Sequence, residues 1–567
     1  MTITNKNQER NILIFLGLWA LINLLQSALT EVHADEAYYW MYSRFLDWGY
    51  FDHPPMVALF IKAGDALFHE PLGLRLMTVL TSTLSVWLLW KMLKPYAENA
   101  RLFILLFSSI VLFHVYGFIT TPDAPLGFFI ILFFYIYRRY QREDQLKWAV
   151  LLALVIAGLL YSKYHALLIL FFTVISNLKL LGRWTFWLIV IGAALLFAPH
   201  IWWQAEHSYP SFYYHIIDRS ASPYRLDFTT GYLLAQLLLA GPLTGWFLYR
   251  KAAMRKSSDG FLRAVKFNFF GIFVFFLIST LKGRVEAHWT LPGMLCLFIL
   301  AYIALAQEKE RRWLGALLVV NIALVALVRL FLVVPVPALQ KIPVVAYYFN
   351  NRQWAGEIRE KAGELPVIFY DSFQDPSRYN YYTNTTKGFA YNSRNYRKNQ
   401  YDIWPLEDSI RYHSAYLVTQ QSQGLGAEDT LNTAKGIWYG TRLDQVRIYQ
   451  KAVVTSSGIP ASWRSGQPVT LKIRIRNPYE QPMKLDNTGQ EYKCYLEYGY
   501  LKEGTLSDFK RVETSFHGLT IAPGATAELS GTIVAPDRPG KYKLVFSLRT
   551  EPFRGGRNSD MIPVEVR

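Results

Sequence analysis

The chain has 567 residues, of which 52% are hydrophobic, and it carries a formal net charge of +17. Apolar runs of about 18 residues recur up to about residue 337, which excludes a soluble globular protein. The positive charge does not predict nucleic acid as a partner, because much of it lies in short loops between apolar runs, where it sets membrane topology.

We predict a polytopic α-helical membrane protein with about eleven transmembrane helices. The first run contains Trp19 and Gln26 and is not followed by a small-x-small cleavage pattern, so we expect it to be a span and not a signal peptide. The run at 122–137 is short, and its length is the least well defined. The predicted spans are at about 11–29, 71–92, 101–119, 122–137, 147–162, 165–180, 184–203, 230–249, 266–281, 288–306 and 313–337.

Basic residues occupy every second loop between these runs. Such loops face the cytoplasm under the positive-inside rule, which places the N-terminus inside. An odd number of spans places everything after about residue 338 outside, and a miscounted helix would break the alternation. The basic clusters are Lys6 and Arg10; Lys91, Lys94 and Arg101; Arg138, Arg139, Arg142 and Lys147; Lys179 and Arg183; Arg250, Lys251, Arg255, Lys256, Arg263 and Lys266; and Lys309, Arg311 and Arg312.

We expect three domains. Residues 1–338 form the transmembrane domain, and residues 339–445 mix helix and strand patterns that predict a small extracytoplasmic α/β domain. From about 446 the pattern changes to period-two alternation, as in 469–476, with turn signals at intervals typical of a sandwich. Residues 446–567 are therefore predicted to form a C-terminal Ig-like β-sandwich.

The first outer loop carries the densest chemistry. An acidic pair, Asp35-Glu36, follows the first span directly, and Asp52-His53 precedes two prolines that fix the local backbone. The aromatic residues around these groups are typical of an interfacial belt and of helices that lie in the membrane interface. The acidic pair is more than solubility requires, so we favour a functional role for Asp35 over simple solvation.

The other outer turns also carry charged groups. Asp123 opens a span after Thr-Thr-Pro, where capping of the helix is the alternative to a chemical role. Lys163 lies between two apolar runs, where interfacial snorkelling is the alternative. Arg284, Glu286 and His288 share one short turn, and its cations run against the charge bias expected of an outer loop.

Together these loops supply the groups needed for transfer from a lipid-phosphate donor. A carboxylate can remove the proton of an attacking hydroxyl. Lysine and arginine can neutralise a phosphate leaving group as its charge develops. A soluble nucleotide donor would instead favour a glycine-rich phosphate loop, and the sequence shows none.

In the order of these motifs the chain resembles the polytopic GT-C glycosyltransferases that use polyprenyl-phosphate sugars. Within that class it is similar to the bacterial relatives of protein O-mannosyltransferases and of the lipid A aminoarabinose transferase, over about residues 10–440. The matching motifs are Asp35-Glu36, Asp52-His53-Pro54-Pro55, Thr121-Pro122-Asp123, Arg284-x-Glu286-x-His288-Trp289, and the tail segment from Asn392 to Trp404.

The resemblance implies a role for each motif. Asp35 takes the position of the catalytic aspartate and would act as general base, in a direct attack that inverts the anomeric carbon. Asp123 would be the second catalytic acidic residue. Glu36, Asp52 and His53 would lie in the acceptor or metal region, and Lys163, Arg284 and His288 would bind the donor phosphate.

The resemblance also implies partners and a location. The donor would be a polyprenyl-phosphate-linked sugar in the lipid bilayer, and the acceptor a hydroxyl of a glycolipid, glycan or protein. Some members hold a divalent metal near the first loop, for which Glu36 and His53 are tentative ligands, although no metal-specific spacing is present. A multi-pass protein of the bacterial inner membrane is expected.

Two other classes of function remain as alternatives. A lipid or glycan transporter or flippase would place polar groups at midspan, often in two repeated halves. Here the halves do not repeat and midspan polar residues are few. An enzymatically inactive scaffold would not need carboxylates and cations in several separate loops. The midspan polar residues are Asn23, Asn268, Asn321 and Arg329.

Overall fold

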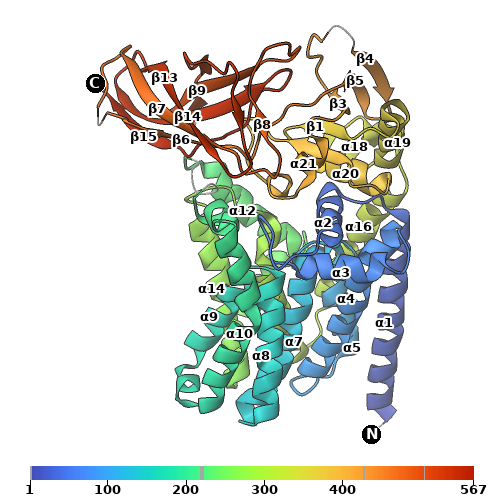
Figure 1. The fold of residues 1–567 in the computed structure, drawn as a ribbon. Helices are drawn as coiled ribbons and strands as arrows, with labels where there is room; N and C mark the ends of the chain where they lie inside the picture. Colours follow the sequence, from blue (N-terminus) through green and yellow to red (C-terminus); the bar gives the residue numbers. More distant parts are fainter. Residues whose placement is uncertain (1–2, 218–222, 426–427, 461, 503–504) are drawn as a thin grey trace. The chain divides into compact units, whose positions relative to one another are not determined.

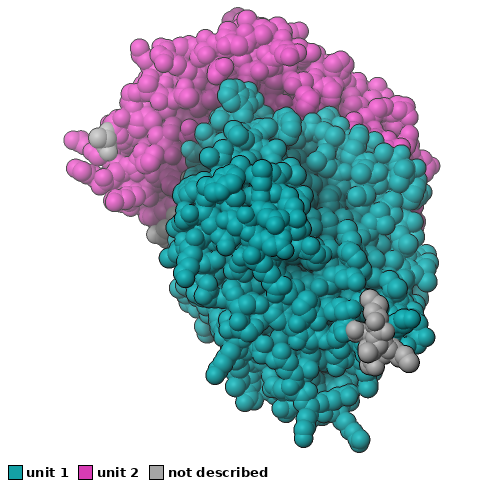
Figure 2. Space-filling model, turned by 90° about the horizontal axis from the view of Figure 1, so that it is seen from below, with its two compact units in different colours: residues 1–349 teal, residues 350–567 magenta. Residues whose placement is uncertain are grey.

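The computed structural model describes residues 3–217, 223–425, 428–460, 462–502 and 505–567 (Figure 1). The chain divides into two compact units, residues 1–349 and 350–567, which are coloured separately in Figure 2. The first unit is helical and the second is rich in β-strands, as the composition predicts.

Helices form wherever the sequence carries a long apolar run, and each of the eleven predicted runs coincides with one helix or with consecutive helices. Six helical segments in the described part of the chain are long and apolar enough to cross a membrane, so the number eleven stays a prediction. The helices of this unit are α1 (Ile3–Leu29), α2 (Ala34–Arg44), α3 (Met56–Asp65), α4 (Pro71–Leu93), α5 (Ala100–Ser109), α6 (Val111–Val115), α7 (Asp123–Arg142), α8 (Leu146–Ser162), α9 (Ala166–Ser176), α10 (Trp184–Glu206), α11 (Pro210–Phe212), α12 (Leu226–Leu239), α13 (Gly245–Met254), α14 (Gly260–Ser279), α15 (Leu291–Ala306), α16 (Arg312–Val333), α17 (Pro337–Gln340) and α18 (Pro343–Ala346), with short turns η1 (Leu178–Gly182), η2 (Tyr213–Ile217) and η4 (Ala287–Thr290).

The predicted span at 230–249 is broken between α12 and α13. Gly241 at the break has a φ of +117°, which is accessible to glycine and strained for other residues. Asn321 of α16 accepts a hydrogen bond from the Leu243 amide at 3.2 Å and donates one to Thr244 Oγ1 at 2.8 Å. This midspan amide therefore satisfies the polar groups that a broken helix leaves free.

Burial separates the central helix from the peripheral ones. Nearly every residue of α15 is buried, and its neighbours are α5, α7, α13 and α14. By contrast, α1, α10 and α16 expose leucine, isoleucine or valine along much of their length. A helix that is apolar on all sides and exposed on most of them is suited to contact with lipid.

The aromatic residues of α2 do not form an interfacial belt, which corrects the interpretation of these residues as lipid-facing. Tyr38, Trp40 and Tyr42 are at most 1% exposed. They pack inside the protein because both α3 and the loop at Tyr50 cover the helix. The first outer loop is thus a folded element with its own core.

The second unit begins with a five-stranded sheet in the order β2-β1-β3-β5-β4. Strands β1, β2 and β3 are parallel, whereas β5 and β4 are antiparallel to their neighbours. Trp354 of α19 packs against Phe369 and Trp438 of the sheet. The elements are α19 (Asn351–Ala362), β1 (Val367–Tyr370), α20 (Gln374–Tyr382), β2 (Gly388–Tyr391), η5 (Gln400–Asp402), α21 (Leu406–Ile410), β3 (Ala415–Thr419), β4 (Asp429–Thr433) and β5 (Gly436–Leu443).

Two larger antiparallel sheets and a two-stranded one, β12-β8, follow and share one hydrophobic core. One has the order β10-β9-β14-β15, with β11 also paired to β9, and the other has the order β13-β7-β6. Alternate residues of β7 are buried, as a strand with one face on a core requires. The Ig-like character of this part stays a prediction. The strands are β6 (Val453–Ser457), β7 (Pro468–Arg476), β8 (Met483–Lys484), β9 (Cys494–Lys502), β10 (Thr505–Leu506), β11 (Lys510–Arg511), β12 (Thr520–Ile521), β13 (Thr526–Val534), β14 (Gly540–Thr550) and β15 (Ile562–Val566).

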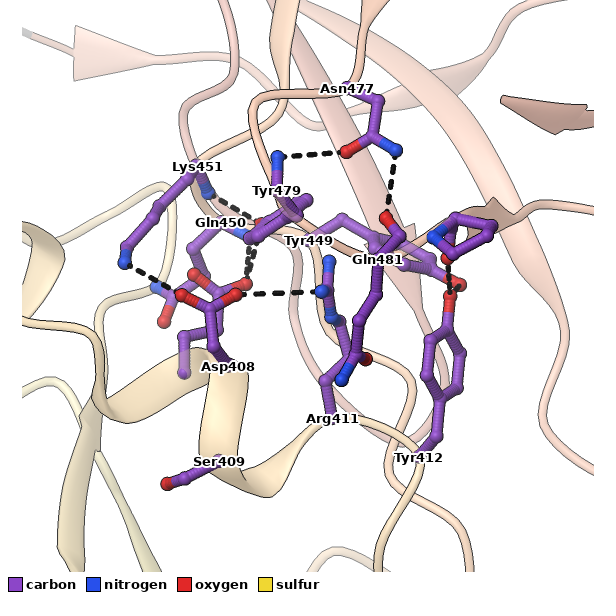
Figure 3. A network of polar contacts seen from close by, with 12 residues as sticks. Asp408, Ser409, Arg411, Tyr412, Tyr449, Gln450, Lys451, Asn477, Tyr479 and Gln481 are labelled. Atoms are coloured by element: carbon purple, nitrogen blue, oxygen red, sulfur yellow. Dashed lines mark hydrogen bonds and ion pairs between the residues drawn. The ribbon is translucent and has the colours of Figure 1, made fainter. Parts of the chain in front are cut away.

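A polar network joins these two parts within the second unit (Figure 3). The fully buried Arg411 guanidinium lies 3.7 Å from the centre of the Tyr479 ring and pairs with Asp408 at 3.4 Å. Lys451 pairs with the same carboxylate at 3.5 Å, and Tyr412 donates to the Pro482 carbonyl at 2.8 Å. Residues predicted as two outer domains therefore cluster as one compact unit.

Candidate active site

The acidic pair that follows α1 divides into a buried and an accessible carboxylate. Both Glu36 and Arg75 are fully buried and form a bidentate ion pair, with Nε–Oε1 at 2.8 Å and Nη2–Oε2 at 2.5 Å. Glu36 also accepts hydrogen bonds from the backbone amides of Thr120 at 2.9 Å and His33 at 3.1 Å. Two-point pairing of this kind fixes the orientation of the carboxylate and also balances its charge.

Arg75 completes the same anchor. Its guanidinium donates to the carbonyls of Ser27 at 3.1 Å, Thr30 at 2.8 Å and Glu31 at 2.9 Å, which are at the C-terminal end of α1 or just beyond it. The Glu36–Arg75 pair therefore ties the end of α1, the start of α2, the first turn of α4 and the Thr120 turn together. Each of these groups would be costly to leave unpaired in an apolar surrounding.

Asp35 is held at the open side of this anchor. Its side chain is 41% exposed and its Oδ2 atom lies 3.7 Å from His33 Nδ1. His33 caps α2 by accepting a hydrogen bond from the Asp35 amide at 3.2 Å, and Glu36 completes the capping box. The carboxylate of Asp35 is thus accessible while its backbone is fixed.

The second and third outer turns meet in a buried ion pair. Asp123 Oδ2 accepts a hydrogen bond from Lys163 Nζ at 2.7 Å, and both residues are at most 4% exposed. The predicted alternatives fail for both residues. Pro122 is the cap residue of α7 and no side chain caps it, and Lys163 is buried instead of reaching toward the membrane surface.

His288 brings the fourth outer turn to the same place. Its Nε2 atom lies 3.7 Å from Asp123 Oδ2, and its side chain is 40% exposed. The charged groups close enough to act electrostatically on the His288 imidazole are Asp123, Lys163, Glu286 and Asp35. Residues from four predicted outer loops, separated by up to 253 positions, therefore lie near one partly exposed histidine.

Tyr39 shows the same convergence from the side of α2. Burial raises the pKa of the Tyr39 hydroxyl well above its usual value, and the negative charges of Asp52, Asp35 and Asp123 raise it further. The hydroxyl stays protonated and can donate a hydrogen bond at any physiological pH. Three acidic residues of the predicted site thus surround one phenol.

Asp52 and His53 line the inner side of this region. Asp52 is buried and accepts a hydrogen bond from the Tyr42 hydroxyl, and its carbonyl accepts one from His215 Nε2 at 2.9 Å. The His53 ring lies 5.8 Å from Tyr39 and 6.0 Å from His215, between ring centres. Sequence reasoning did not identify Tyr39, Tyr42 or His215, because isolated aromatics and histidines carry no distinguishing pattern in a chain with 37 tyrosines.

Arg284 belongs to the same outer turn. Its side chain is 76% exposed and pairs loosely with Glu286, with Nε–Oε1 at 4.0 Å. Arg284 therefore lies at the surface of the turn that carries His288, and its contact with the donor phosphate stays a prediction.

The residues predicted to hold a metal do not fit one. Both Glu36 oxygens are taken by Arg75, and within the described ranges no group of three or more histidine, cysteine, aspartate or glutamate side chains could hold a metal ion. A carboxylate that already binds a guanidinium at two points is a poor ligand. The described residues of this site therefore offer no set of metal ligands.

The tail motif from Asn392 to Trp404 forms a local network of hydrogen bonds in the second unit. Asn392 Nδ2 donates to Asp402 Oδ2 at 2.7 Å, and the Asn399 amide donates to the same oxygen at 2.8 Å. Burial raises the pKa of the Asp402 carboxyl. These bonds give the motif a role in shaping the loop between β2 and α21.

The class to which the fold belongs is visible in comparisons with known proteins. Residues 52–203 match the family model of dolichyl-phosphate-mannose-protein mannosyltransferases, a stretch that includes Asp52, Asp123 and Lys163. Two solved structures of ArnT from Cupriavidus metallidurans share the fold, in the apo state (TM-score 0.56) and bound to undecaprenyl phosphate (TM-score 0.55). Each is 15% identical and covers 76% of this chain and 97% of that protein.

A curated relative extends the comparison. The chain is 24% identical over 310 residues to the lipid A galacturonosyltransferase RgtD of Rhizobium johnstonii, a match that covers 51% of this chain and 64% of that protein. The matched region thus spans slightly less than two thirds of the relative's length. The resemblance to polytopic GT-C glycosyltransferases that use polyprenyl-phosphate donors is confirmed by these findings together.

Proposed function

We propose that the chain is a membrane glycosyltransferase that moves a sugar from a polyprenyl-phosphate-linked donor to a hydroxyl acceptor at the outer face of the membrane. The observation that carries this proposal is the convergence of an accessible carboxylate, Asp35, with the Asp123–Lys163–His288 cluster. The family match and the named relatives support the same reaction class.

In the proposed reaction the acceptor hydroxyl oxygen attacks the anomeric carbon of the donor. Asp35 takes the hydroxyl proton as the new C–O bond forms. The bond between the anomeric carbon and the phosphate oxygen breaks, and its electron pair stays on that oxygen. Direct attack inverts the anomeric centre and releases the polyprenyl phosphate.

The Lys163 ammonium and the His288 imidazole are the hydrogen-bond donors that would face the departing phosphate. Charge that develops on the phosphate oxygen is stabilised most by donors fixed in a buried site before reaction. Asp123 holds Lys163 at 2.7 Å and lies beside His288, so we assign Asp123 the role of positioning both groups. Arg284, at the exposed edge of the same turn, would contact the outer part of the phosphate.

Asp52, His53 and Tyr39 would form the acceptor side of the site, since they lie next to Asp35 in the first outer loop. Lipid A appears in the name of the curated relative, and a lipid-linked acceptor fits a site at the membrane surface. We further propose that the protein lies in the bacterial inner membrane, spans it eleven times and has a cytoplasmic N-terminus. The C-terminal sheets are proposed to form an Ig-like sandwich.

The direct test is a transfer assay with purified full-length protein and undecaprenyl-phosphate-linked sugars. We expect release of undecaprenyl phosphate coupled to a glycosylated acceptor, and a loss of about 10²–10⁴-fold in rate for Asp35→Asn. Asp227→Asn is the matched control, because Asp227 is an exposed aspartate on the predicted outer side and pairs with Arg225 at 3.0 Å. Full activity of Asp35→Asn would remove Asp35 from the mechanism, and transport without a covalent product would overturn the proposal.

A further inference from the structure

A hollow in the first unit lies beside α1, toward the end of the helix that is away from Asp35. It has a volume of about 830 Å³ and is lined by α1, α5 and α16, which contact one another. Its α1 lining begins at Asn11 and ends at Leu18. At a rise of about 1.5 Å per residue, even Leu18, the α1 lining residue nearest to Leu29, lies roughly 16 Å from the end of the helix, so this hollow is separate from the candidate active site.

The walls of the hollow are apolar and open to the outside of the helix bundle. Phe15 forms a buried part of the lining, whereas Ile14, Leu18 and Val319 are 56%, 51% and 54% exposed. A Cβ atom added at Gly315 would meet nothing within 4 Å. The hollow is therefore a groove that an alkyl chain could occupy without displacing protein atoms.

One end of the groove is polar and basic. Arg101, Glu310 and Arg312 line it, and Arg101 Nη1 pairs with Glu310 Oε1 at 3.3 Å with both side chains about three-quarters exposed. Helices α5 and α16 both begin at this end, and no side chain caps α16. The free amides and positive dipole of a helix N-terminus add to the field of Arg312.

We propose that this groove binds one anionic phospholipid. The acyl chain would lie along α1 and α16, and the head-group phosphate would contact Arg312, Arg101 and the first amides of α16. Charge complementarity selects this occupant, since an apolar helix of a second copy would leave the basic end without a counter-charge. The basic loops predict that this end faces the cytoplasmic leaflet, where anionic lipids attract basic residues.

The test uses the purified full-length protein in detergent, with phosphatidylglycerol and phosphatidylcholine of identical acyl chains as probes. Native mass spectrometry would count the lipids retained per protein. We expect at least about fivefold greater retention of phosphatidylglycerol, as one unbalanced basic residue at a membrane surface gives. Gly315→Phe should abolish that preference, because its ring would fill the groove.

Gly17→Phe is the matched control. Gly17 is an exposed glycine of α1 with the same open space around its Cβ, and it does not line the groove. Arg312→Gln is the second variant, because Arg312 is exposed and its removal should lower the preference without altering the apolar walls. Equal retention of both lipids would overturn the proposal, as would an unchanged preference in Gly315→Phe and Arg312→Gln. The proposal would also fail if Gly315→Phe disrupted a dimer of the protein and released no bound lipid.

Discussion

Two adjacent carboxylates, Asp35 and Glu36, have opposite environments in this molecule. Glu36 is fully buried against Arg75, and Asp35 is 41% exposed at the convergence of four outer loops. A buried ion pair stabilises mainly by the cost of breaking it, whereas an accessible carboxylate is free to act on a substrate. Glu36 is therefore suited to a structural role and Asp35 to a chemical one, although the two residues are consecutive.

This difference predicts that Glu36→Gln destabilises the protein strongly. Removing one charge leaves the Arg75 guanidinium buried without a counter-charge, at a cost of about 3–5 kcal/mol. Thermal unfolding of the purified protein in detergent measures the effect, and Asp35→Asn should change stability by less than about 1 kcal/mol. An unchanged unfolding temperature in Glu36→Gln, together with weaker metal dependence, would instead support the predicted metal role of Glu36.

The Asp123–Lys163 pair gives a second prediction. Asp123→Asn and Lys163→Met each leave one buried charge without its partner and should cost about 3–5 kcal/mol. The double variant removes both charges, so it should cost clearly less than the sum of the single changes. Unfolding of the three variants measures this coupling. Additive effects would show that the two side chains do not interact in the folded protein.

At the scale of elements, α21 carries a buried carboxylate that makes the second unit sensitive to pH. Glu407 Oε1 accepts hydrogen bonds from the Tyr479 hydroxyl and the Gln450 amide, both at 2.7 Å. Burial raises the pKa of the Glu407 carboxyl above its usual 4.5. The folded state therefore binds this proton more tightly than the unfolded state does.

The raised pKa of Glu407 determines how stability changes with pH. Glu407 contributes a stability that is fully present below pH 4.5 and is lost as the pH rises through the raised value in the folded protein. Glu407→Gln keeps an acceptor for both donors and removes the titration, so the variant should lose less stability between pH 4.5 and pH 7. Unfolding of the full chain as a function of pH checks this.

Glu480→Gln is the control for that experiment, since Glu480 is an exposed glutamate in the same unit. We expect its pH profile to follow the unmodified protein. A Glu407→Gln profile that also follows the unmodified protein would show that burial of this carboxyl does not affect folding.

Much of the element scale was predictable from the sequence. Long apolar runs marked the helices of the first unit, and alternation marked β7, because burial imposes these periods directly. The breaks in the predicted spans at 101–119 and 230–249 were not predicted. The second depends on Asn321, which is about 80 residues away and supplies hydrogen bonds only once α16 is in place.

At the scale of the whole molecule, the alternation of basic loops makes a prediction about orientation. Cysteine substitutions at Ser257 and Ser465, both exposed, place one reporter in a predicted cytoplasmic loop and one in the second unit. A membrane-impermeant maleimide applied to intact cells, with the outer membrane permeabilised, should label Ser465→Cys and spare Ser257→Cys.

The unmodified chain is a suitable background, because its two cysteines, Cys296 and Cys494, are buried. Labelling of both positions after the inner membrane is disrupted shows that each is reactive. Labelling of Ser257→Cys in intact cells, with Ser465→Cys protected, would reverse the proposed topology and place the candidate active site on the cytoplasmic side.

The sequence by itself determined the class of fold and most of the candidate site. Asp35, Asp123, Lys163 and His288 stand out because charged groups in short outer loops of a membrane protein need a reason to be there. Only the tertiary structure decided that Glu36 is an anchor and that Arg284 is at the surface. It also decided that Tyr39 lies near the carboxylates and that His215 contacts the Asp52 carbonyl. Periodicity reports how each segment meets apolar surroundings, whereas a pairing such as Glu36 with Arg75 joins segments that touch only after the helices have packed.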